Sequence, residues 1–136
     1  MRKHARVGVI AASSLVAAVA LASPASAATD SLAVARSNAG PSCTSLSNGS
    51  LCIALVDGGS TVRVVYGKTG GSAITAKLGY KKGGLTKYAD AVTVKNGDTK
   101  VQEWKRQDIG CSNVIGVIAP HGQDVFETPP LHNPSC

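Results

Sequence analysis

The chain has 136 residues, of which 43% are hydrophobic and 16% are charged, and its 14 basic and 8 acidic residues give a formal net charge of +6. A chain of this length makes one domain around one core. Three of the basic residues, Arg2, Lys3 and Arg6, precede the first apolar run, so removal of that segment lowers the charge of +6 by three, to +3. Such a charge excludes a dedicated nucleic-acid-binding protein and leaves a mild attraction to anionic surfaces.

Residues 1–27 have the three parts of a cleavable secretory signal peptide. A basic start is followed by an apolar run at 7–22 and by the small residues Ala25-Ser26-Ala27. The apolar run is shorter than the ~20 residues that span a bilayer, and no basic stop-transfer cluster follows it. We therefore predict cleavage after Ala27 and a secreted, extracellular protein without a stable membrane anchor. The segment resembles the signal peptides of secreted proteins from high-GC Gram-positive bacteria.

Residues 28–42 are small and polar and show no sustained period, which predicts a flexible N-terminal leader. The domain itself is predicted to span 43–136. It contains all four cysteines, Cys43, Cys52, Cys111 and Cys136. An even number of cysteines in a short exported chain predicts two disulfides.

Four cysteines allow three pairings, and we predict Cys43–Cys52 and Cys111–Cys136. Asn48-Gly49 is a strong two-residue hairpin signal, and a turn there brings Cys43 one diagonal step from Cys52. The alternative is a zinc site made by Cys111, Cys136 and two histidines, His121 and His132. Zinc sites usually begin with a closely spaced cysteine pair, which this set lacks, so we predict no metal and no cofactor.

From residue 43 onward, short β-like runs alternate with Gly-rich turns. The continuous apolar run at 51–56 predicts a central strand. Further runs lie at 61–66, 73–80, 88–94, 99–104, 114–119 and 124–128. Asn96-Gly97 is interpreted as a second hairpin turn, and the prolines at 129, 130 and 134 are expected to end strand pairing. About seven short strands at intervals of roughly 8–12 residues predict an all-β, small antiparallel β-sandwich, an architecture that resembles immunoglobulin-like sandwiches.

Motifs for catalysis are absent from the sequence. Gly67-Lys68-Thr69 lacks the upstream glycine of a phosphate-binding loop, because position 62 is Val62. No Gly-x-Ser-x-Gly motif occurs, and paired cysteines leave no thiol nucleophile. His121 and Asp124 are interpreted as turn residues rather than as parts of a triad. We therefore predict that the protein is not an enzyme.

The leading functional hypothesis is a secreted, non-catalytic binding protein whose partner is an extracellular protein. In one version it inhibits an extracellular protease through a rigid loop, with Lys68 or the pair Lys105-Arg106 offered to a trypsin-like pocket. Rigid loops favour binding because little ordering entropy is lost.

The alternative hypothesis is a cell-envelope-associated protein that binds an anionic wall polymer or polysaccharide. Its basis is a stretch rich in lysine and tyrosine and free of acidic residues. The candidate binding residues are Lys77, Tyr80, Lys81, Lys82, Lys87 and Tyr88. The single tryptophan, Trp104, is interpreted as a core residue rather than as a binding platform.

Overall fold

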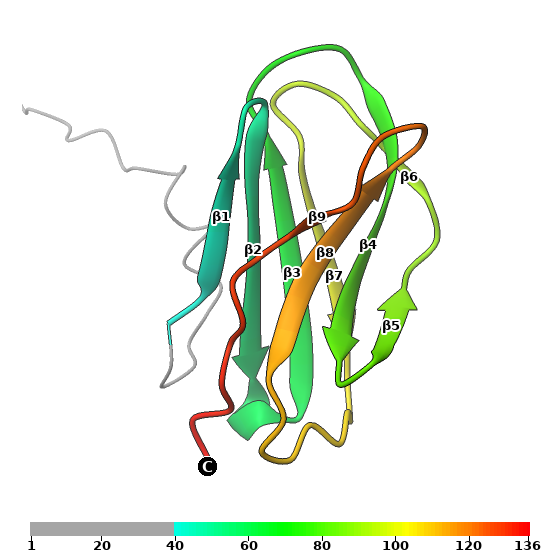
Figure 1. The fold of residues 1–136 in the computed structure, drawn as a ribbon. Coiled ribbons are helices and arrows are strands. Elements are labelled where there is room, and N and C mark those ends of the chain that lie inside the picture. The colour runs from blue at the N-terminus through cyan, green and yellow to red at the C-terminus, as the bar shows by residue number, and fades with distance from the viewer. Residues whose placement is uncertain (1–39) are drawn as a thin grey trace, which may run out of the picture.

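The computed structural model describes residues 40–136. The predicted signal peptide at 1–27 and residues 28–39 of the predicted leader lie outside the described residues. The described part forms two antiparallel sheets that pack face to face, as Figure 1 shows. Its strands are β1 (Ser42–Leu46), β2 (Gly49–Val56), β3 (Thr61–Lys68), β4 (Ile74–Lys82), β5 (Leu85–Tyr88), β6 (Val92–Val94), β7 (Thr99–Trp104), β8 (Val114–Pro120) and β9 (Phe126–Glu127). A short 3-10 turn, Asp57–Gly59, joins β2 to β3.

The first sheet has the strand order β1-β2-β3-β7, and the second has the order β5-β4-β8-β9, with β6 also paired to β4. This arrangement confirms the predicted all-β class and the antiparallel sandwich. The strands outnumber the expected seven partly because the run at 88–94 forms parts of two short strands, β5 and β6, instead of one.

The core lies between the two sheets and follows the period-2 pattern of the sequence. Alternate residues of β2 and β3 point inward, and alternate residues of β4 and β8 meet them from the second sheet. Trp104 is 9% exposed, and its ring packs edge-on against Tyr80 with 5.0 Å between the centroids. The interpretation of Trp104 as a core residue is therefore confirmed.

Both predicted disulfides are present, but the first hairpin has a different register from the expected one. Cys43 lies directly opposite Cys52, with 4.1 Å between the Cα atoms, because the two turn residues are Ser47 and Asn48. Gly49 already belongs to β2. A Cβ there would lie 2.2 Å from the carbonyl oxygen of Gly67 on β3, so glycine is required for close packing and not for a left-handed turn.

The predicted second hairpin is wrong. The segment around Asn96-Gly97 does form a tight turn, in which the Asp98 amide donates to the Lys95 carbonyl oxygen at 3.0 Å. However, Val94 pairs with Ile74 in the second sheet, while the strand that starts at Thr99 pairs with β3 in the first. The turn therefore carries the chain from one sheet to the other, and its two flanking strands do not pair.

The C-terminal tail closes one side of the sandwich between β8 and β2, where it descends beside β2 in Figure 1. Leu131 exchanges two backbone hydrogen bonds with Val114, so pairing continues beyond the first two prolines, contrary to expectation. The end of the tail is fixed by the disulfide Cys111–Cys136, with 5.5 Å between the Cα atoms. Two disulfides agree with folding in an oxidising compartment.

Candidate ligand-binding face

The outer face of the second sheet gathers half of the predicted polymer-binding residues. Alternation along β4 turns Ala76, Leu78 and Tyr80 into the core, and it turns Lys77 and Lys81 outward. Tyr88 of β5 pairs with Gly79, and this register places it on the same outward side. We call the surface formed by Lys77, Lys81 and Tyr88 the β4 face.

The ring of Tyr88 occupies the space that a side chain at position 79 would fill. A Cβ at Gly79 would lie 2.7 Å from Cδ1 of Tyr88 and 3.0 Å from Cγ2 of Val117. Val117 is fully buried although it points outward, while Tyr88 remains 41% exposed. The ring is therefore seated against the sheet by its contact at Gly79, and part of it faces solvent.

The two lysines of the β4 face differ in their partners. The Nζ of Lys81 forms an ion pair with the Glu127 carboxylate of β9. Lys77 forms no side-chain hydrogen bond or ion pair with another residue in the part of the chain that the structure describes. Its ammonium group is therefore available to a ligand.

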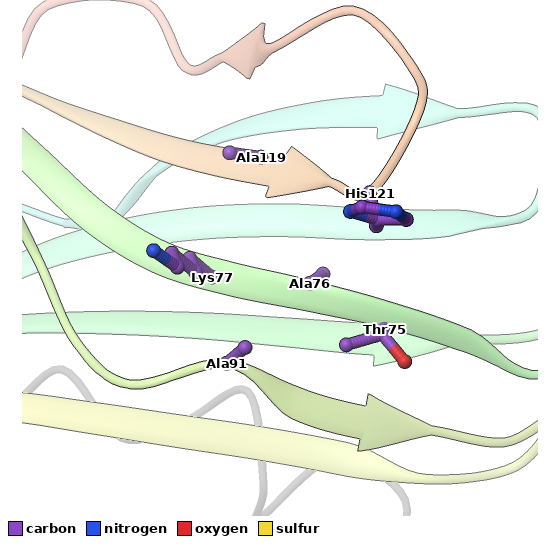
Figure 2. Close-up of a pocket in the computed structure, with 6 residues that line it drawn as sticks. All are labelled: Thr75, Ala76, Lys77, Ala91, Ala119 and His121. Atoms are coloured by element: carbon purple, nitrogen blue, oxygen red, sulfur yellow. The ribbon is translucent and has the colours of Figure 1, made fainter.

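A shallow hollow of about 90 Å³ lies at one end of the β4 face. Figure 2 shows Lys77 and Thr75 on β4, with His121 and Ala119 from the β8 side and Ala91 from the opposite side. The backbone amide of His121 donates to the carbonyl oxygen of Thr75 at 2.8 Å, which continues the pairing beyond β8. His121 was expected to be a turn residue, and the pairing of β8 with β4 brings it beside Lys77.

The other three predicted polymer-binding residues lie elsewhere. Tyr80 is 6% exposed, and its hydroxyl donates to Oε1 of Gln107 at 2.6 Å. Lys82 and Lys87 point to the opposite side of the sheet from Lys81. There, Lys82 donates to the Asp108 carbonyl oxygen. Lys87 donates to Oε1 of Gln107 at 3.1 Å. Nearness in sequence did not ensure a shared face, because adjacent strand residues point in opposite directions.

Burial changes the acidity of two tyrosine hydroxyl groups. Desolvation raises the pKa of the Tyr80 hydroxyl above its ordinary value, and it does the same for Tyr66 in the core. Both phenols are therefore held in their neutral form.

Lys68, one of the two candidate inhibitory positions, is not on an exposed loop. Strand β3 continues two residues beyond Tyr66, so Lys68 pairs with Gly49 and is 1% exposed. Its Nζ donates to the carbonyl oxygen of Gly70. A buried side chain does not enter the pocket of a protease, so Lys68 is removed from the candidate loops.

Lys105 and Arg106 are exposed, and the loop that carries them is held at several points. The backbone amide of Gln107 donates to the Ser60 carbonyl oxygen at 2.7 Å, and its side-chain Nε2 donates to the Lys105 carbonyl oxygen at 2.7 Å. Arg106 has a φ of 55°, in the left-handed region that residues other than glycine seldom adopt. The two hydrogen bonds of Gln107, to Ser60 and to Lys105, hold this conformation in place.

Residues 40–136 contain no group of three or more metal-binding side chains. The two cysteines of the alternative zinc set, Cys111 and Cys136, are bonded to each other. Within the same residues, no helix has the length and apolar character needed to cross a membrane.

Comparisons of the chain with models of protein families, with curated protein sequences and with solved structures found no significant match.

Proposed function

We propose that this protein is exported by a bacterium and binds a polymer of the cell envelope through the β4 face, without catalysis. The observation that carries the proposal is the position of Tyr88. Its partly exposed ring lies against the sheet at Gly79, and Gly79 lies midway along β4 between Lys77 and Lys81.

The spacing of these groups suits a chain-like ligand. Lys77 and Lys81 are four residues apart on one strand, which corresponds to about 13 Å. A polymer lying along β4 would meet the two ammonium groups on either side of the tyrosine ring. The ring supplies apolar contact area for a sugar or polyol unit. Lys77 attracts anionic groups, and Lys81, although paired with Glu127, keeps further N–H donors for the ligand.

The test is cosedimentation of the purified protein with bacterial cell walls. We expect binding that weakens steeply as salt is added, because Coulombic attraction between exposed charges is screened. Tyr88→Ala is expected to weaken binding about tenfold, as is loss of both lysines in Lys77→Gln/Lys81→Gln. Lys95→Gln is the matched control, because Lys95 is an exposed lysine in the turn between β6 and β7.

Two results would contradict the proposal. One is wall binding that neither salt nor the β4-face variants change. The other is a Lys95→Gln variant that loses as much binding as the double lysine variant, because net charge alone would then explain the attraction.

A second function, inhibition of an extracellular protease, is favoured by one specific observation. Gln107 fixes the exposed Lys105-Arg106 loop through the hydrogen bonds described above, and a pre-ordered loop loses little entropy on binding. We expect an inhibitor of this kind to act on trypsin-like enzymes and to lose inhibition in Lys105→Ala or Arg106→Ala. Simple digestion of the protein by a panel of secreted proteases would eliminate this second function.

A further inference from the structure

We infer that the hollow beside Lys77 binds a phosphate group, and that the polymer bound by the β4 face is joined by phosphodiester links. The inference rests on the proposed function, since it names the chemical class of the polymer. Its basis is the juxtaposition of Lys77, Thr75 and His121 around one hollow (Figure 2).

Three of the side chains that line the hollow carry hydrogen-bond donors. Lys77 offers an ammonium group with three donors, Thr75 offers one hydroxyl donor, and His121 offers at least one ring N–H. A phosphodiester carries one negative charge, shared by two non-bridging oxygens, and two bridging oxygens, all arranged around a tetrahedral phosphorus. Such a group accepts hydrogen bonds from several sides at once, whereas the two oxygens of a carboxylate lie in one plane.

The size of the hollow fits a compact group rather than one water molecule. Its volume of about 90 Å³ far exceeds the ~10–15 Å³ that a single water needs. The space exists because Ala91 and Ala119, the residues beside Lys77, have only a methyl side chain. A larger residue at either position would fill the hollow.

The charge distribution of the β4 face also favours anion binding at the end where the hollow and Lys77 lie. Lys81 is already paired with Glu127, whereas Lys77 has no carboxylate partner among residues 40–136. An anion that approaches the face therefore finds its uncompensated positive charge at the hollow. The neighbouring Tyr88 ring then contacts the adjoining sugar or polyol unit.

The experiment is an NMR titration of the purified protein with dimethyl phosphate, with inorganic phosphate and with acetate, at constant ionic strength. We expect saturable shifts of the His121 ring signals and of the Thr75 and Lys77 amides with dimethyl phosphate. Acetate is expected to bind at least fivefold more weakly. Lys77→Gln is expected to weaken dimethyl phosphate binding about tenfold, and Lys95→Gln is expected to leave it unchanged.

Two variants test whether the hollow itself is used. Ala119→Leu and Ala91→Leu place bulk in the hollow from opposite sides, and both are expected to abolish the dimethyl phosphate shifts. Absence of saturable shifts, or equal binding of acetate, would overturn the inference. Much tighter binding of inorganic phosphate than of the diester would also overturn it, because the site would then serve free phosphate rather than a polymer.

The outcomes separate this inference from the proposed function. If Tyr88→Ala weakens wall binding while Ala119→Leu and Ala91→Leu do not, the phosphate assignment fails and the polymer-binding face stands. If dimethyl phosphate saturates the hollow but no wall polymer binds, the proposed function fails instead, and with it the assignment of a phosphodiester polymer.

Discussion

Gly49 shows how a single missing side chain sets the geometry of the first hairpin. Its position allows β2 to approach β3 so closely that a Cβ would lie 2.2 Å from the Gly67 carbonyl oxygen and 3.1 Å from the ring of Tyr66. The clash is with backbone, which does not move as easily as a flexible side chain.

Gly49→Ala is therefore expected to lower the free energy of unfolding by about 1–3 kcal/mol, the usual cost of overpacking. Urea denaturation measures the change. Gly70→Ala is the control, because a Cβ at Gly70 meets nothing within 4 Å. Equal stability of the two variants would show that β2 and β3 do not approach as closely as described.

The buried tyrosines make stability depend on alkaline pH. Because burial raises the pKa of Tyr66 and Tyr80, the folded state keeps these protons above about pH 10, where the unfolded chain releases them. The folded state then binds more protons than the unfolded state, so the free energy of unfolding falls as pH rises.

This decline is checked by urea denaturation between pH 8 and pH 11.5. Tyr80→Phe is expected to make the decline shallower, and the same substitution at the half-exposed Tyr88 controls for loss of a hydroxyl group. A slope that Tyr80→Phe leaves unchanged would remove burial of this phenol as the cause.

At the level of strands, period-2 alternation predicts which residues of β3 and β4 face the core, whereas the continuous apolar run of β2 shows no such period. The same alternation turns Lys77 and Lys81 to one side and Tyr80 to the other, although all three were grouped as candidates for one binding surface. What it did not supply was the pairing between strands. Glu127 and His121 reach the β4 face only through β9 and β8, and a partner strand distant in sequence is not encoded in local periodicity.

The two Asn-Gly signals illustrate the same limit. Asn96-Gly97 forms a tight turn, and Asn48 is the second residue of the first turn, with Gly49 directly after it. Local backbone preferences predict a turn near both pairs. The register of the first turn was decided by contact between Gly49 and β3, and the second turn connects two sheets. Both outcomes depend on tertiary packing rather than on the turn residues.

The Lys105-Arg106 loop is expected to resist cleavage because Gln107 fixes it. Gln107→Ala removes the acceptor for Tyr80 and Lys87 and the donor to Lys105. Trypsin is therefore expected to cut after Lys105 or Arg106 several-fold faster in this variant, as measured by mass spectrometry of early products. Gln123→Ala, in the exposed turn after β8, is the control and should leave the rate unchanged. Equal rates for all three proteins would show that Gln107 does not hold the loop.

For the whole molecule, the two disulfides stabilise the sandwich at separate places. Cys43–Cys52 joins the edge strand β1 to β2, and Cys111–Cys136 fastens the C-terminal tail. Loop-closure entropy gives them about 6 kcal/mol together, and native-state strain lowers their usual contribution to about 4–6 kcal/mol. This is comparable to the ~5–15 kcal/mol total stability of many domains.

Reduction is therefore expected to lower the melting temperature greatly or to unfold the protein. Thermal unfolding followed by circular dichroism, with and without a reductant, measures this effect. Cys111→Ala/Cys136→Ala is expected to lose part of that stability while β1 stays joined to β2. A melting temperature that full reduction does not change would contradict this account of the fold's stability.

We propose that a cell-envelope polymer binds along β4. Chemical-shift mapping of the isotope-labelled protein, as soluble wall-polymer fragments are added, tests this binding mode residue by residue. We expect the largest shifts at Lys77, Lys81 and Tyr88 and at the neighbouring residues of β8. Shifts confined to the Lys105-Arg106 loop, or no shifts with any fragment, would contradict it.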